Sequence, residues 1–127
     1  MSDYITKIRT ADGDLPVDYE SLANKPSISY GVGENSIQQV GSSAEGDYSH
    51  AGGKNTKATA YAQTAIGKYN IENADALLIV GNGEDDSSRS NAFEVLQNGS
   101  IVIGGITLTA EKLAKIIKFI DSIEEVM

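Results

Sequence analysis

The feature that most constrains this chain is a run of small residues with a period of seven. Alanines recur every seven residues, and each is followed two positions later by glycine or alanine. A heptad of such residues cannot form a coiled-coil seam, because a seam needs bulky aliphatic side chains and glycine inside a helix costs about 1 kcal/mol relative to alanine. The pattern predicts a short β-roll or β-solenoid whose neighbouring backbones approach closely at the small residues. The eight residues are Ala44, Ala51, Ala58, Ala65, Gly46, Gly53, Ala60 and Gly67.

Composition favours a structural role. The chain has 127 residues, 6% aromatic residues and no Trp, so it has little material for a large core, and we expect help from partner subunits. A net charge of −8 argues against nucleic acid and anionic membranes as partners, since both require basic patches. Without cysteine there are no disulfides and no thiol-ligated metal sites, and we predict no cofactor. The sequence shows neither a leader pattern nor an apolar stretch of about 20 residues, so we expect synthesis in the cytosol and a soluble product.

Four zones can be separated by pattern, the first being residues 1–30. Here Asp12 and Gly13 form a turn signal between two short strands, and Pro16 restricts the second strand to an edge. We expect a helical turn at 21–24 and an extended chain from Pro26 to Ile28. The second zone, residues 31–70, carries the repeat, and its Gly- and Ser-rich composition leaves a flexible linker as the alternative.

The third zone, residues 71–106, has the strongest strand signals. The apolar run 76–80 predicts a strand buried on both faces. Residues 92–97 and 100–103 flank Asn98 and Gly99, which predict a hairpin with a type I′ turn. Alternation places Phe93 and Val95 on one face of this hairpin and Glu94 and Leu96 on the other. A polar loop is expected at 84–90.

The last zone, residues 107–127, is predicted to be a helix with Thr109 as its N-cap and Glu111 in its first turn. Its apolar residues recur at spacings of three and four, which is a coiled-coil seam, and isoleucine at both core positions favours trimers or tetramers. Packing of this helix on the molecule's own β-part is the alternative. The seam residues are Leu113, Ile116, Ile120, Ile123 and Met127.

The order of charge along this helix complicates the parallel trimer. Lysines occupy its first half and acidic residues its second half, which is the reverse of what the helix dipole prefers. Antiparallel packing of two helices would pair basic with acidic halves, whereas parallel packing places like charges at similar heights. An antiparallel dimer therefore stays open.

Several segments together resemble bacteriophage virion fibre and spike proteins. The segment YSHAGG at residues 48–53, followed by Asn55, Thr56 and Ala58, is similar to the Ser-His-Ala-Gly repeats of phage tail-fibre and spike proteins and to the heads of trimeric autotransporter adhesins. Other segments look like phrases that recur in phage fibre proteins. They are DYESLANKPSI at 18–28, LIVGNG at 78–83 and RSNAFEVL at 89–96.

This resemblance implies an elongated, intertwined homotrimer that attaches to a phage capsid or tail protein and projects outward from the virion. The chain is short for a complete tail fibre, so a head fibre, a capsid decoration spike or a fibre module fits its length better. The resemblance assigns virion attachment to the first zone. The attachment residues are Asp18, Tyr19, Leu22, Pro26 and Ile28.

The sequence offers little chemistry, and we predict that the protein is not an enzyme. His50 is the one histidine and lies inside the repeat, so we interpret it as a repeat residue; three copies meeting at a trimer axis would form a metal or anion site, which is a hypothesis. The acidic residues 84–86 lack the alternating spacing of a calcium loop. The glycines at 31–33 and 81–83 do not continue into a phosphate-binding helix and are assigned to turns.

Tyr48, Tyr61 and Tyr69 lie in the repeat zone. Exposed aromatic rings on a β-surface stack on sugars, so host-glycan contact by Tyr48 and Tyr61 is the alternative function, whereas packing between coils is the simpler interpretation. We also expect the four repeat alanines to lie at the trimer interface together with the helical seam. The fold class predicted is thus mainly β, an elongated trimer with a C-terminal helical bundle.

Overall fold

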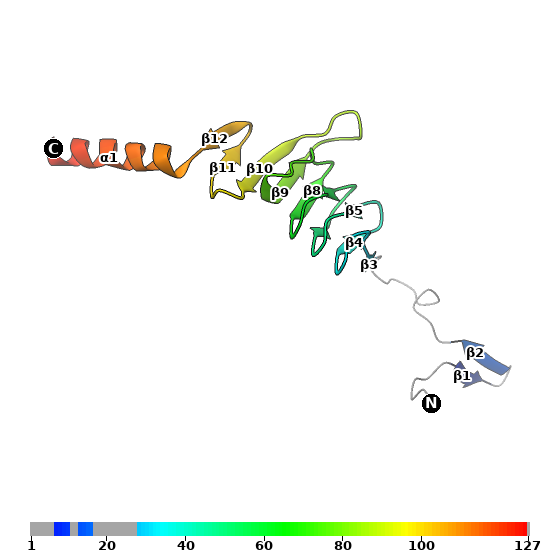
Figure 1. Ribbon diagram of the computed structural model, residues 1–127. Helices are drawn as coiled ribbons and strands as arrows, with labels where there is room; N and C mark the ends of the chain where they lie inside the picture. The colour runs from blue at the N-terminus through cyan, green and yellow to red at the C-terminus, as the bar shows by residue number, and fades with distance from the viewer. Residues whose placement is uncertain (1–6, 11–12, 17–27, 127) are drawn as a thin grey trace.

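A computed structural model of the chain describes residues 7–10, 13–16 and 28–126. The described chain is mainly β, with 37% of residues in strands and one C-terminal helix (Figure 1). Strands β1 (Lys7–Thr10) and β2 (Gly13–Pro16) pair antiparallel, with Thr10 opposite Gly13, which confirms the two N-terminal strands. The helical turn predicted at 21–24 lies outside the described residues.

The other strands form two sheets. The larger sheet is mixed: β4, β6, β8 and β9 run parallel, and the strands at its two ends are antiparallel to their neighbours. The smaller sheet contains the parallel pair β5 (Ser43–Ala44) and β7 (Lys57–Ala58). The larger sheet has the order β12 (Ile106–Leu108), β11 (Ile101–Ile103), β10 (Asn91–Leu96), β9 (Ala76–Asn82), β8 (Thr64–Lys68), β6 (His50–Ala51), β4 (Ile37–Gln39), β3 (Ile28–Tyr30).

The parallel strands β6, β8 and β9, and the pair β5 and β7, return at an interval of fourteen residues. The first step, from Ile37 of β4 to His50 of β6, spans thirteen. His50 pairs with Thr64, Thr64 pairs with Leu78, and Ser43 pairs with Lys57. Fourteen residues therefore carry the chain through one strand of each sheet and back to the next level of the stack. The seven-residue period of the sequence is half of this circuit, so successive alanines alternate between the two sheets.

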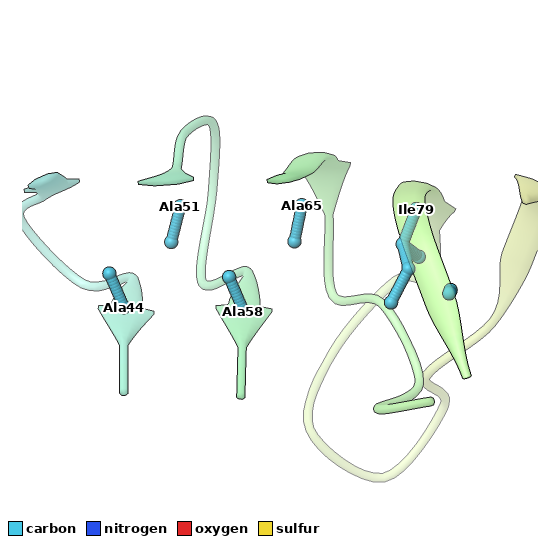
Figure 2. Close-up of a cluster of buried hydrophobic side chains, with 6 residues drawn as sticks. Ala44, Ala51, Ala58, Ala65 and Ile79 are labelled. Atoms are coloured by element: carbon cyan, nitrogen blue, oxygen red, sulfur yellow. The ribbon is translucent and has the colours of Figure 1, made fainter. Parts of the chain in front are cut away.

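The repeat alanines form the core of a single chain. Ala51 and Ala65 on the larger sheet point toward Ala44 and Ala58 on the smaller one, and Ile79 continues the row (Figure 2). All five side chains have no accessible surface within one chain. The prediction that the alanines lie at a trimer interface is therefore wrong, because a side chain with no accessible surface in one chain has none to offer a partner.

Each half-circuit turns at a residue with positive φ, at positions 48, 55, 62 and 69. The residue after each turn is a buried polar one whose side chain bonds to nearby backbone. Thr56, for example, donates from Oγ1 to the carbonyl of Gly52, and its N–H donates to Ser42 Oγ at 3.0 Å. These hydrogen bonds and strands show that residues 31–70 are ordered structure rather than a flexible linker. The buried polar residues in this series are Ser49, Thr56, Gln63 and Asn70.

Two hairpins, β10–β11 and β11–β12, form one end of the larger sheet. The hairpin of β10 and β11 is confirmed, with Val95 opposite Ile101, but its turn differs from the type I′ prediction. Gly99 has positive φ and Asn98 does not, and Gly99 N–H donates to the Leu96 carbonyl, as in a three-residue turn with a glycine bulge. The second hairpin joins β11 to β12 through Gly104 and Gly105, both with positive φ; the sequence analysis did not separate it from the first. The polar segment 84–90 is a loop between β9 and β10, as predicted.

The C-terminal helix α1 (Ala110–Val126) begins as predicted. The N–H of Lys112 donates to Thr109 Oγ1 at 3.1 Å, and the N–H of Leu113 donates to the Thr109 carbonyl at 2.9 Å. None of its described residues is buried, and the helix leads away from the end of the sheet (Figure 1). The alternative in which this helix packs on the chain's own β-part is therefore wrong.

Candidate self-association surface

One face of the larger sheet is uncovered, and across β9, β10, β11 and β12 it is mainly apolar. Residues paired across neighbouring strands place their side chains on the same face, so the register defines two rows that cross the sheet. The first row contains Ile37, His50, Thr64, Leu78, Val95, Ile101 and Leu108. The second row contains Ile66, Val80, Phe93, Ile103 and Ile106.

The opposite face of the same sheet covers the core. Ala65, Ile79 and Glu94 lie on it in register, and Glu94 is only 8% exposed. By contrast, Ile103 is 57% exposed and Ile106 is 76% exposed on the uncovered face. The predicted division of β10, with Phe93 and Val95 on one face and Glu94 and Leu96 on the other, agrees with this register.

Strand β9 shows the same asymmetry, which corrects the prediction that it is buried on both faces. Ala76 and Ile79 have no accessible surface, whereas Leu77 is 40% exposed and Leu78 and Val80 are half-buried. The register slips by one residue between Val95 and Leu96, so Leu77 bulges out of the ladder. The continuous apolar run that suggested two buried faces therefore supplies one buried face and one uncovered face.

The apolar surface continues into the helix. Leu108 ends the first row, Thr109 caps the helix, and the seam begins at Leu113. The four described seam residues are between 43% and 47% exposed, and apolar residues flank them on both sides. The described residues of this helical face are Leu113, Ile116, Ile117, Phe119, Ile120, Ile123 and Val126.

The two edges of the parallel stack differ in charge. Parallel strands align their amino ends on one edge and their carboxyl ends on the other. Counted from the register row His50, Thr64 and Leu78, the residue three positions earlier is Asp47, Tyr61 or Asp75. The residue four positions later is Lys54, Lys68 or Asn82. All six are exposed. We call these sets the acidic edge (Asp47, Tyr61, Asp75) and the basic edge (Lys54, Lys68, Asn82).

Both edges are held in register by direct contacts. On the basic edge Lys54 and Lys68 form a parallel bridge, and the Tyr69 N–H donates to the Lys54 carbonyl at 3.0 Å. On the acidic edge the Ala62 N–H donates to the Asp47 carbonyl at 2.8 Å, and Asp47 Oδ1 accepts from the backbone N–H of Glu34 at 2.8 Å. The charges therefore occupy fixed heights along the stack.

The three repeat tyrosines divide into two groups. Tyr69 packs between coils: its hydroxyl accepts from Asn55 Nδ2 at 2.8 Å, and Lys54 Nζ and Arg89 Cζ lie 5.9 and 5.5 Å from its ring centroid. Tyr48 and Tyr61 lie at the opposite edge, where their ring centroids are 5.7 Å apart in an edge-to-face arrangement. Both of these rings are more than half exposed, so they remain available to a partner.

The other sequence-predicted candidates are dispersed. His50 is exposed on the uncovered sheet face between Ile37 and Thr64. In the part of the chain that the structure describes, no three His, Asp, Glu or Cys residues are grouped as metal ligands would be. Within the acidic loop, Asp86 pairs with Arg89, whose Nη1 donates to the carbonyls of Asn55 and Asn70, both at 3.0 Å.

The predicted attachment residues fall mostly outside the description. Asp18, Tyr19, Leu22 and Pro26 lie outside the described residues, as does the seam residue Met127. Ile28 is half exposed at the edge strand β3, where it lines an apolar groove of about 430 Å³. Ser29, Tyr30 and Ile37 complete the lining of this groove.

Sequence reasoning missed the uncovered sheet face, although the signal is present. The alternation of Ile101 and Ile103, then Ile106 and Leu108, repeats the spacing of Phe93 and Val95. Three successive strands with apolar residues in phase indicate a face that must be covered.

Comparisons with protein-family models, curated proteins and solved structures found no match for this chain. Of the helices in residues 7–10, 13–16 and 28–126, none has the length and hydrophobicity needed to span a bilayer.

Proposed function

We propose that this chain is a structural virion protein of a bacteriophage that assembles as a short, elongated homotrimer. In this proposal it is a head fibre, a capsid decoration spike or a fibre module that attaches to a capsid or tail protein and projects outward. The fourteen-residue parallel repeat supports a short β-solenoid for the central part of the chain. The resemblance of its segments to phage fibre proteins supports the virion location.

The observation that carries the proposal is the uncovered apolar surface. One face of the larger sheet and one face of α1 expose isoleucine, leucine and phenylalanine side chains in a chain of net charge −8. Contiguous apolar surfaces of this kind mark interaction sites, because burial of each such side chain is worth about 1.5–3 kcal/mol. A structural subunit that completes its core with copies of itself accounts for this surface.

The helix favours a parallel trimeric bundle. With Leu113 and Ile116 at the two core positions, Ile117 and Phe119 flank the seam, and such a wide apolar face suits three helices better than two. Lys115, Lys118, Asp121 and Glu125 fall at outer positions, and Lys112 and Glu124 flank the seam. Most of the helix charges therefore do not meet between parallel helices.

The uncovered sheet adds a second argument for the parallel arrangement. The chain passes from β12 through a single cap residue, Thr109, into α1. An antiparallel pair of helices would place the two sheets at opposite ends and leave both apolar faces exposed to water. A parallel trimer brings the sheets together at one end and covers both surfaces at once.

The seam can be tested by charge substitution. Replacing Ile116 and Ile120 with Asp should release monomers, while circular dichroism should still report the β-structure. The matched control places Asp at Ala114 and Ser122, which are exposed residues outside the seam. Full assembly of the Ile116→Asp/Ile120→Asp variant would show that the helix does not hold the subunits together.

The virion location has its own test. Mass spectrometry of purified particles of a phage that encodes this chain should find the protein in copy numbers divisible by three. Absence of the protein from particles that retain their other fibres would contradict the proposal.

A host-glycan receptor-binding tip is the second candidate, and the Tyr48–Tyr61 pair favours it. Two exposed rings 5.7 Å apart offer a surface on which a sugar ring can stack. This function predicts saturable binding on a glycan array that is lost when Tyr48 and Tyr61 are changed to Ala. Lack of binding by the native protein on a broad array would count against it.

A further inference from the structure

We propose that the basic edge of one chain docks on the acidic edge of a second copy at the same height along the stack. The inference rests on the proposed homotrimer and specifies which surfaces of neighbouring subunits meet. Its basis is the register of the two edges and the charge and chemistry of the six residues that occupy them.

The residues at each height are complementary. At β6 the basic edge presents Lys54 and the acidic edge presents Asp47, which suits an ion pair between copies. At β8 the corresponding residues are Lys68 and Tyr61, which suit a cation–π contact.

The complementarity continues at β9. Here the two edges present Asn82 and Asp75, which suit an amide-to-carboxylate hydrogen bond. Three successive levels are therefore matched when two copies stand side by side in the same direction.

Within one chain, the residues of the basic edge cannot contact those of the acidic edge. Asp47 and Lys54 lie beyond opposite ends of β6, and Tyr61 precedes β8 whereas Lys68 is its last residue. Lys54 instead has Lys68 as its neighbour across a parallel bridge, which places two positive charges on adjacent levels. A partner edge carrying Asp47 would offset this repulsion.

An interface between two different edges is heterologous, and repetition of such an interface gives a closed trimer when neighbouring chains are related by a rotation of one third of a turn. When the uncovered face of the larger sheet points toward the ring axis, the two edges of each chain face its two neighbours. A single threefold arrangement then buries both edges and the uncovered face of the sheet. The same arrangement makes the three helices parallel. An isologous dimer would instead bring like edges together.

Cysteine cross-linking tests this arrangement in a chain that has no native cysteine. The full-length Asp47→Cys/Lys54→Cys variant should give covalent trimers under mild oxidation, seen as a threefold mass on a denaturing gel without reductant. Either single-cysteine variant should stay at the mass of one chain. Efficient dimer formation by the single Lys54→Cys variant would indicate an isologous contact and overturn the proposal.

Charge reversal gives an independent test that does not require a disulfide. Lys54→Glu and Asp47→Lys should each raise the concentration at which the oligomer dissociates by about tenfold, because three equivalent contacts change from attractive to repulsive. The double variant should restore the native value. The matched control is Lys57→Glu, which makes the same change in charge on β7, where Lys57 pairs with Glu72 at 3.5 Å.

The outcomes separate this inference from the proposed function. A native protein that is monomeric overturns the homotrimer itself. A native trimer that neither cross-links between positions 47 and 54 nor responds to charge reversal leaves the homotrimer in place and overturns the edge-to-edge contact.

Discussion

Ala51 of β6 pairs in register with Ala65 of β8, and both side chains are completely buried inside one chain. Two sheets can approach this closely because the facing side chains are methyl groups. The same relationship explains why alanine recurs at these positions of the repeat.

Enlarging this core should destabilise the chain itself. Ala51→Leu adds three carbon atoms where no space remains, and overpacking of this kind costs about 1–3 kcal/mol. Thermal or denaturant unfolding followed by circular dichroism measures the loss. Ala114→Leu, an exposed site on α1, is the control and should leave the unfolding midpoint of the β-part unchanged.

Substitution of a glycine that lies between coils should also destabilise the chain. Gly53 has a φ of 98°, and a Cβ added there would collide with the backbone carbonyl of Gly67. Gly99 has a similar φ of 86° with nothing within 4 Å of such a Cβ. Gly99→Ala should therefore cost about 1–2 kcal/mol for the backbone conformation alone, and Gly53→Ala clearly more. Equal losses of unfolding free energy in the two variants would contradict close packing between coils.

Asn70 substitutes for a missing strand. Its Oδ1 accepts from the Lys57 N–H at 2.7 Å and its Nδ2 donates to the Lys57 carbonyl at 3.0 Å, so it closes the open side of β7. Asn70→Ala should lower the free energy of unfolding by about 1–3 kcal/mol, because these backbone groups lose their partners. Gln97→Ala, at an exposed position outside both edges, serves as the control in the same unfolding experiment. An Asn70→Ala variant as stable as that control would show that the side-chain bonds to Lys57 contribute nothing.

The repeat can be extended by a full circuit and not by half of one. Inserting a second copy of residues 55–68 after Lys68 keeps every later strand in its own sheet, so the protein should fold with one additional level of about 4.8 Å. Inserting a copy of residues 62–68 alone would bring β9 to the side occupied by β7 and should abolish cooperative unfolding. Equal stability of the two insertions, measured by thermal denaturation, would contradict the fourteen-residue circuit.

Several elements of this fold were predictable because local chemistry decides them. The Asn98–Gly99 hairpin, the Thr109 cap and the seven-residue ladder depend on residues close in sequence. The role of the alanines was not predictable, because close approach of a partner chain and close approach of the chain's own next coil require the same small side chains. The prediction that both faces of β9 are buried was also wrong. A continuous apolar run does not show whether each face is covered by the same chain.

The surface for self-association was predictable in part. The spacing from Leu113 to Ile123 identified the helical stripe, which the structure leaves exposed. The sheet face and the two charged edges depend on the fourteen-residue register, which joins residues far apart in the sequence. The register is defined by the pairing of strands, which residue spacing alone does not specify.

The measurement that tests the central claim most directly is the solution mass of the native protein by light scattering. The account predicts three times the chain mass of 13.4 kDa. This mass should stay constant at all concentrations above that at which the trimer dissociates. A mass of one chain would contradict the account, since the uncovered sheet face and helix would then remain in water. A mass of two chains would contradict the parallel trimer and favour antiparallel helices.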